Sequence, residues 1–135
     1  MECLVQNGYF EARDDGYASI MGVSNVVLNR VQDPRYPDTV CDVVYQGYTD
    51  STGFPIRNKC QFSWYCDGKS DKITDTYHKT NVVIIVYESV SLWYNSIDIT
   101  EGATHYHADY VNPKWATQLE YTTQIGTHKY YKWNR

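Results

Sequence analysis

A periodic apolar segment near the N-terminus constrains the fold of this chain more than any other feature. Apolar side chains recur there at helical spacing, at Ile20, Val23, Val27 and Val31, with Met21 and Leu28 beside them. This pattern predicts a helix over residues 18–32 with a wide buried face. Pro34 and Pro37 end it, because proline lacks an amide donor and restricts the residue before it.

The rest of the chain divides into helical and irregular stretches. Residues 75–95 contain a β-branched run over 82–86 that would also suit a buried strand, but the length of the segment favours a helix. We predict two short helices, over residues 2–12 and 39–45, with Asp38 as the N-cap of the second.

Residues 46–72 are rich in Gly, Ser, Thr and Asp and predict loops with a short hairpin. The chain is predicted to be irregular again from 102 to 115, and 125–131 is a strand or an extended end. The predicted fold class is therefore mainly α (α+β).

Length and composition limit the classes of protein to which the chain can belong. Its 135 residues suit one domain, 1–135, and 42% hydrophobic with 21% charged residues is ordinary for a globular protein. No stretch approaches the roughly 20 apolar residues of a membrane-spanning helix. A net charge of -4 with scattered Lys and Arg makes nucleic acid a poor partner. Residues 1–10 lack the features of a secretory signal.

The four cysteines are Cys3, Cys41, Cys60 and Cys66, which are too few and too dispersed for a disulfide-dense scaffold. Five residues separate Cys60 from Cys66, so a disulfide could close a small loop there. Zinc sites usually have cysteines two to four residues apart and need further ligands. The spacing favours a disulfide or two thiols over zinc.

Glu11 is a candidate general acid. It lies near the end of the first predicted helix, where the helix dipole disfavours a negative charge, and its neighbours Tyr9 and Phe10 can desolvate it. Both effects predict a raised pKa. From these residues alone, a surface carboxylate paired with Arg13 or a lysine is the simpler interpretation. The fourteen tyrosines and four tryptophans include faces on which sugar rings can stack, although most aromatic side chains simply fill a core.

Taken together, several segments of the chain resemble the cell wall hydrolases of the spore cortex-lytic (SleB-like) type. They are Tyr9-Phe10-Glu11-Ala12-Arg13, Val26-Val27-Leu28-Asn29-Arg30-Val31, Pro34 through Val44-Tyr45-Gln46, Cys60-Gln61-Phe62-Ser63-Trp64, Ala103-Thr104-His105-Tyr106-His107, Asn112-Pro113-Lys114-Trp115 and Ile125-Gly126-Thr127-His128. The resemblance covers about residues 8 to 131, and its strength lies in the shared order of the segments.

The resemblance implies one lysozyme-like domain that cleaves the glycan strands of peptidoglycan as a lytic transglycosylase. Glu11 would protonate the oxygen leaving C1 of N-acetylmuramic acid and then act as a base, giving 1,6-anhydro ends. The substrate-binding residues expected from it are Gln61, Ser63, Trp64, Tyr106 and His107. No cofactor and no metal are expected, and we expect a monomer.

The setting that we expect is a bacteriophage lysin, released from the host cytoplasm by a holin or carried in a virion. A catalytic domain of a longer bacterial protein fits the sequence equally well.

The chain departs from the family after Arg13. The family usually continues Gly-Glu, where this chain has Asp14-Asp15-Gly16. If a left-handed turn is needed, Asp14 tolerates it better than most residues. Asp15 is shorter than the usual Glu, so its role in capping a helix or orienting Glu11 is open.

Three other functions compete with this interpretation. His105, His107 and Asp109 imitate the His-x-His-x-Asp start of metallo-β-lactamase-like sites, but Tyr110 stands where a further His is usual. A glycan-binding module without activity would suit the aromatic content. A cysteine amidase ranks last, because no catalytic signature surrounds any cysteine.

Overall fold

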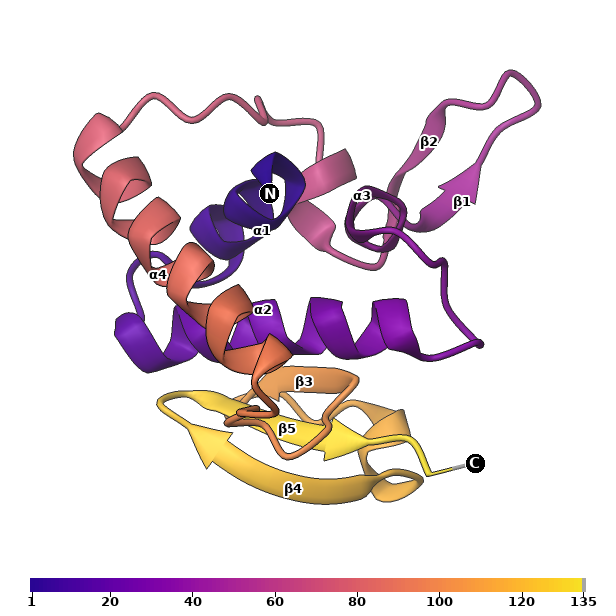
Figure 1. The fold of residues 1–135 in the computed structure, drawn as a ribbon. Helices are drawn as coiled ribbons and strands as arrows, with labels where there is room; N and C mark the ends of the chain where they lie inside the picture. Colours follow the sequence, from indigo (N-terminus) through magenta and orange to yellow (C-terminus); the bar gives the residue numbers. More distant parts are fainter. Residues whose placement is uncertain (135) are drawn as a thin grey trace.

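The α2 helix (Tyr17–Gln32) forms the centre of the fold in this computed structural model, which describes residues 1–134. Eleven of its sixteen residues are buried. Helices α1 and α4 lie on one side of α2 and a three-stranded sheet lies on the other (Figure 1). The predicted helix and its wide buried face are therefore confirmed, and the face is wide because α2 is covered from two sides.

The other helices build the main core against α2. The α1 (Glu2–Ala12) and α4 (Thr76–Tyr94) helices pack on α2 and on each other, and the short α3 (Val40–Val44) contacts α1 and α2. The N-cap of α3 is Thr39, whose side chain accepts a hydrogen bond of 3.2 Å from the amide of Asp42. The prediction of Asp38 as the cap was wrong by one residue.

Two small antiparallel sheets complete the α+β fold. The predicted hairpin is formed by β1 (Gly47–Thr49) and β2 (Pro55–Cys60), followed by a 3-10 turn, η1 (Ser63–Cys66). The second sheet has the strand order β3-β5-β4. Its strands are β3 (His105–Ala108), β4 (Glu120–Ile125) and β5 (His128–Lys132), with a 3-10 turn, η2 (Lys114–Thr117), between β3 and β4.

This second sheet corrects the prediction for the C-terminal part of the chain. The stretch 102–115 was expected to be irregular, yet it contains β3, which pairs with β5 from His105 opposite Tyr131 to Ala108 opposite His128. The β4 strand was not predicted. Val26 of α2, Ala103 and Tyr130 form a second small core that joins α2 to the sheet.

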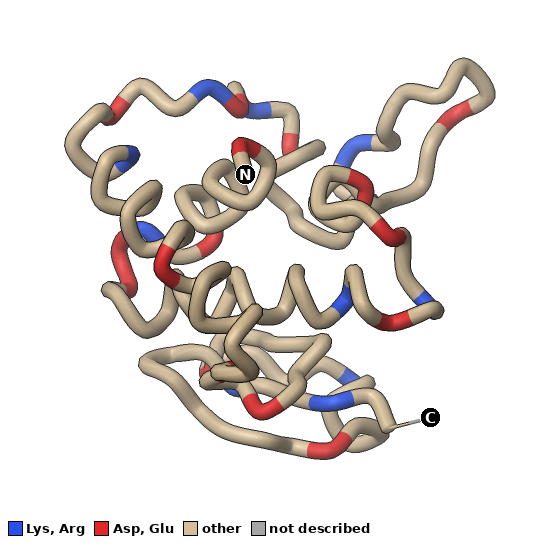
Figure 2. Tube along the Cα trace, in the orientation of Figure 1, with Lys and Arg blue, Asp and Glu red and all other residues tan. Residues whose placement is uncertain are grey.

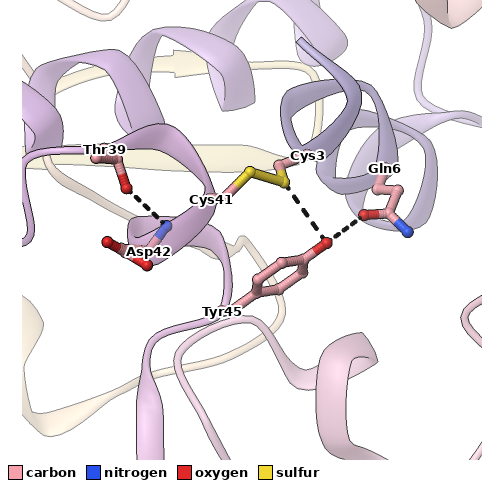
Figure 3. Close-up of a disulfide and its surroundings, with 6 residues drawn as sticks. All are labelled: Cys3, Gln6, Thr39, Cys41, Asp42 and Tyr45. Atoms are coloured by element: carbon pink, nitrogen blue, oxygen red, sulfur yellow. Dashed lines mark hydrogen bonds between the residues drawn. A yellow bond between two sulfur atoms is a disulfide. The ribbon is translucent and has the colours of Figure 1, made fainter.

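All four cysteines form disulfides. The predicted Cys60–Cys66 bond is present, and it closes the short loop after β2. The bond between Cys3 and Cys41 was not predicted; it ties α1 to α3 across 38 positions of sequence (Figure 3). Beside it, Tyr45 donates a hydrogen bond of 2.7 Å to Oε1 of Gln6.

The charged residues form no single basic surface: Lys and Arg are dispersed along the fold among Asp and Glu (Figure 2). Within residues 1–134, no helix combines the length and the apolar character that crossing a bilayer requires.

Candidate active site

Glu11 stands in the last turn of α1 and lines a pocket of about 180 Å³. Helix α1 contributes this carboxyl and α2 contributes a guanidinium. The loop after β2 forms one wall of the pocket, and β3 together with η2 forms the other. The lining residues are Glu11, Arg30, Gln61, Phe62, His105, Tyr106 and Trp115. The chain thus brings together residues that lie more than 100 positions apart.

Two adjacent residues of α2 fix the segment that enters β3. The Asn29 side chain donates to the carbonyl of Ala103 at 2.9 Å, and Nε of Arg30 donates to the carbonyl of Thr104 at 2.7 Å. The next residues are the first of β3, so this double contact sets the start of the strand. Because side chains alternate along a strand, Tyr106 leaves the opposite face from its two neighbours.

The hydroxyl of Tyr106 donates a hydrogen bond to Oε1 of Glu11. Burial raises the pKa of Glu11, while the Tyr106 hydrogen bond and the positive charge of Arg30 act to lower it. Burial has the larger effect, so the predicted upward direction of the pKa is confirmed. Desolvation thus favours the neutral acid, and two neighbouring groups favour the carboxylate that remains after it gives up its proton.

Arg30 is a buried cation in this pocket, with 5% of its surface exposed. Its guanidinium lies 5.1 Å from the ring of Tyr36 and 5.3 Å from the ring of Phe62. Nη1 is buried and, among residues 1–134, has no hydrogen-bond partner. Burial lowers the pKa of Arg30, and the charges of Tyr36, Tyr106 and Glu11 oppose that shift. Arg30 therefore places a buried positive charge near Glu11.

His105 forms part of the wall between Glu11 and the surface. Burial, with Arg30 and Arg35 nearby, lowers the pKa of His105 to about 4. Nδ1 of His105 lies 2.9 Å from Oγ1 of Thr104, and the centres of the His105 and Trp115 rings are 5.2 Å apart. The imidazole is therefore neutral at pH 7 and held in place.

The residues expected to bind substrate fall into two groups. Gln61 and Tyr106 line the Glu11 pocket. Trp64 does not: it is buried in the core, stacks on Phe10 and donates to Oδ1 of Asn7 at 2.9 Å.

Ser63 and His107 are also absent from the pocket lining. Ser63 is exposed at the start of η1. His107 points from the other face of β3, where its ring stacks on Tyr131 and Nε2 lies 2.9 Å from the Tyr131 hydroxyl. The sequence places Ser63 beside pocket residues and His107 beside Tyr106, but neither side chain lines the pocket.

Arg30, Phe62 and Trp115 line the pocket although they were not among the expected site residues. Their segments carried the family resemblance, but nothing in a single sequence showed that a buried arginine on α2 would meet Glu11. His105 was considered only as a metal ligand.

The departure from the family after Arg13 has a structural explanation. Asp14 does not take up a left-handed conformation; Gly16 does, with φ of 94° at the start of α2. A left-handed turn is therefore not needed at Asp14, and the tolerance of Asp14 for one does not come into use. Oδ2 of Asp15 lies 3.9 Å from Nε2 of His128, whose ring is 5.1 Å from that of Tyr106. Arg13 stacks on Tyr9 and does not pair with Glu11.

Two competing functions lose their structural basis. Within the described part of the chain, no three His, Cys, Asp or Glu side chains are grouped so as to hold a metal ion, and this includes His105, His107 and Asp109. A cysteine amidase needs a thiolate, and every cysteine is in a disulfide.

Comparisons with known proteins agree with this architecture. The chain is 26% identical over 129 residues to the spore cortex-lytic enzyme of Halalkalibacterium halodurans, which covers 95% of this chain and 33% of that protein. The chain thus spans about a third of the length of this relative.

Two solved structures share the fold. The catalytic domain of the germination-specific lytic transglycosylase SleB from Bacillus anthracis matches 97% of this chain and 92% of its own, with a TM-score of 0.71 and 23% identity. The catalytic domain of the Bacillus cereus SleB protein matches 98% of this chain and 91% of its own, with a TM-score of 0.66 and 23% identity.

The sequence profile of one family matches residues 14–131, a range that begins three residues after Glu11 and takes in most of the pocket. The chain therefore belongs to the Cell Wall Hydrolase family.

Proposed function

We propose that this chain is a lytic transglycosylase that cleaves the β-1,4 bond between N-acetylmuramic acid and N-acetylglucosamine in peptidoglycan, with Glu11 as acid and then base. The observation that carries the proposal is the half-buried Glu11 carboxyl at the pocket, with its pKa raised by burial and Oε1 bound by Tyr106. The family and the SleB-like fold support the same substrate class.

In the first step, Glu11 gives its proton to the glycosidic oxygen as the bond from that oxygen to C1 of the muramic residue breaks. Because Tyr106 occupies Oε1, the proton of the neutral acid is carried by Oε2. Tyr106 and Arg30 both stabilise the carboxylate that forms, so they act most strongly as the proton leaves.

In the second step, the C6 hydroxyl of the same sugar attacks C1, and the Glu11 carboxylate takes its proton. This closes a 1,6-anhydro ring, restores the neutral acid and consumes no water. One carboxyl group therefore serves both steps, with the N-acetyl group of the sugar available to stabilise the positive C1.

One neighbour is proposed to hold the substrate. The Gln61 amide offers both a donor and an acceptor at the pocket wall. Ser63, Trp64 and His107 have no part in this proposal because they lie outside the pocket.

Both disulfides bear on where the enzyme works. Disulfides persist in oxidising surroundings and are rare in the reducing cytosol, so we expect the folded enzyme to act outside it. That is compatible with action on a cell wall. The bacteriophage setting stays a prediction from the sequence.

The test is digestion of purified peptidoglycan by the wild type, by Glu11→Gln, and by Glu2→Gln as a matched control on the exposed start of the same helix. Mass spectrometry of the released fragments should find 1,6-anhydro ends for the wild type and the control, and none for Glu11→Gln. Reducing muramic ends that need Glu11 would instead show a hydrolase that uses water. Equal cleavage by Glu11→Gln would contradict the proposal.

A further inference from the structure

Tyr106 shares its face of the sheet with two buried side chains, His128 and Tyr130. Tyr106 lies opposite Tyr130 in the pairing of β3 with β5, and side chains two positions apart on a strand share a face, so His128 belongs to the same face. The centre of the Tyr106 ring is 5.1 Å from that of His128 and 5.6 Å from that of Tyr130. These two rings therefore set the direction in which the Tyr106 hydroxyl points.

The His128 ring is in turn oriented by a carboxylate from outside the sheet. Nε2 lies 3.9 Å from Oδ2 of Asp15, and Nδ1 is buried without a hydrogen-bond partner among residues 1–134. Burial lowers the pKa of His128, and His107 acts in the same direction. The carboxylates of Asp15 and Asp109 oppose that shift. The neutral ring therefore prevails at pH 7, and Asp15 favours the tautomer that carries its proton on Nε2.

Asp15 belongs to the turn that follows Glu11. Its amide donates to the carbonyl of Ala12 at 3.0 Å, between the end of α1 and the start of α2. The contact between Asp15 and His128 thus ties the end of the helix that carries the Glu11 carboxyl to the strand that packs on Tyr106. It braces both sides of the hydrogen bond between Tyr106 and Glu11.

We propose that Asp15 and His128 act as a positioning pair, which holds the Tyr106 hydroxyl on the Glu11 carboxyl. The Asp15 carboxylate fixes the plane of the imidazole, and the imidazole supports the ring of Tyr106. Neither member of the pair lines the Glu11 pocket, so both act through Tyr106. This inference rests on the proposed function, because it gives the pair a role in proton transfer by Glu11. It assigns a role to Asp15, where the family usually has a longer Glu.

The pair predicts a shift whose sign separates it from a direct effect of charge. The Tyr106 hydrogen bond lowers the pKa of Glu11, so loosening it by removing the Asp15 carboxylate should raise that pKa. If the Asp15 charge acted on Glu11 directly, its removal would lower the same pKa. Arg30 and Tyr130, whose charges also interact with that of Glu11, are kept in every variant.

The test compares the wild type with Asp15→Asn, with Asp15→Glu as the conservative variant and with Asp14→Asn as the matched control. The Asp14 side chain is 76% exposed in the same turn. Carbon-13 NMR measures the pKa of the Glu11 carboxyl, and kcat and KM are measured against pH on solubilised peptidoglycan strands.

Asp15→Asn should raise the Glu11 pKa and move the alkaline limb upward. It should lower kcat about three- to fivefold, the scale of one partly exposed charged contact, and leave KM unchanged. Asp15→Glu should restore most of kcat, because its longer carboxylate still reaches His128. Asp14→Asn should behave as the wild type.

A double-mutant cycle tests whether the effect passes through Tyr106. In the Tyr106→Phe protein there is no hydroxyl to hold, so Asp15→Asn should cause no further change in kcat or in the Glu11 pKa. An equal loss of kcat in both backgrounds would overturn the positioning pair, as would an unchanged or lowered Glu11 pKa in Asp15→Asn. Nitrogen-15 NMR provides a second check, since a wild-type His128 ring with its proton on Nδ1 would also contradict the proposal.

These outcomes are separate from the peptidoglycan digest. If Glu11→Gln still cuts the wall, the catalytic proposal fails. The NMR titration of Glu11 needs no turnover, so it still reports whether Asp15 holds Tyr106 on that carboxyl.

Discussion

The hydroxyl of Tyr106 on β3 donates to Oε1 of Glu11 at the end of α1, joining residues 95 positions apart. The contact connects the sheet to the helical core at the carboxyl that we propose as the proton donor. It depends on Asn29 and Arg30, which hold the backbone of residues 103 and 104 just before β3. The adjacent pair Asn29-Arg30 thus has a positioning role that its sequence neighbours alone do not reveal.

Tyr106→Phe should move the alkaline limb of the pH profile upward. The hydrogen bond lowers the pKa of Glu11, so its removal raises that pKa, and the neutral acid persists to higher pH. The maximal rate should fall about 10- to 100-fold, because the carboxylate formed on proton donation loses a charge-assisted hydrogen bond. The measurement is kcat/KM against pH, with Tyr121→Phe on β4 as the control. An alkaline limb that stays in place would show that Tyr106 does not influence Glu11.

Arg30→Met should shift the same limb in the same direction. The positive charge of Arg30 also lowers the pKa of Glu11, and methionine removes that charge while filling much of the space. Arg30→Lys keeps a charge but loses the planar contact with Thr104, so its limb should shift less than that of Arg30→Met. If the lysine and methionine variants shift equally, the charge of Arg30 is not what acts on Glu11.

The sequence predicted the helical part of the fold well because helices depend on local periodicity. The wide apolar face of α2 and the Asp75 start of α4 follow from spacing within a few turns. The β3-β5-β4 sheet depends on pairing between distant segments, such as His105 with Tyr131, and its strands are short, with only four residues in β3 and six in β4. Strands this short give too little periodicity to predict β3 or β4.

The pocket residues also divide into those that the sequence could indicate and those that depend on tertiary packing. Glu11 could be singled out because a resemblance marked it, and Gln61 and Tyr106 followed in the same way. Trp64 was expected in the groove from the same resemblance, but its indole donates to Oδ1 of Asn7 in the core. Arg30 was missed because burial of a charge is decided by tertiary packing, as is the Cys3–Cys41 bond.

His105 should make the fold less stable in mild acid. Its pKa is about 4 in the folded protein against 6.5 for an ordinary histidine, so the unfolded chain binds the proton more readily between these values. The stabilisation is complete above pH 6.5 and is lost as the pH falls toward 4. Urea unfolding of the wild type and His105→Asn across this window should show a weaker pH dependence in the variant.

Glu11 contributes with the opposite sign, because its pKa is raised on folding and its stabilisation is lost as the pH rises. Both proteins keep Glu11, so the difference between them isolates His105. If the free energies of unfolding of the wild type and of His105→Asn change equally with pH in this window, the lowered pKa of His105 is contradicted.

Gly22→Ala should destabilise the contact between α2 and the sheet. A Cβ at residue 22 would lie 2.5 Å from the Tyr130 hydroxyl oxygen, in a fully buried site where that side chain cannot swing into solvent. We expect a loss of about 1 to 3 kcal/mol in the free energy of unfolding, as in other overpacked cores. Denaturant titration measures it.

Tyr130→Phe is the matched variant for this contact. The Tyr130 hydroxyl is buried without a hydrogen-bond partner among residues 1–134, so its removal alone should cost little. Combined with Gly22→Ala it should recover part of the lost stability, since the nearest clashing atom is gone. Additive effects of the two substitutions would mean that the strain lies elsewhere.

The two disulfides should differ in their contributions to stability. In the chain-entropy account, a crosslink stabilises by restricting the unfolded chain, and more so for a longer loop. The Cys3–Cys41 bond spans 38 positions and the Cys60–Cys66 bond spans 6. Replacing each pair by serines should therefore lower the free energy of unfolding by roughly 4 and roughly 2 kcal/mol, respectively.

Thiol titration of the denatured, unreduced protein provides the direct check on both bonds. The structure predicts no free thiol, because each of the four cysteines is paired. Two thiols would mean that one bond is absent, and the serine variant with no effect on stability would identify which. An equal loss from both variants would show that loop length does not govern their contributions, and that native contacts such as those of α1 with α3 do.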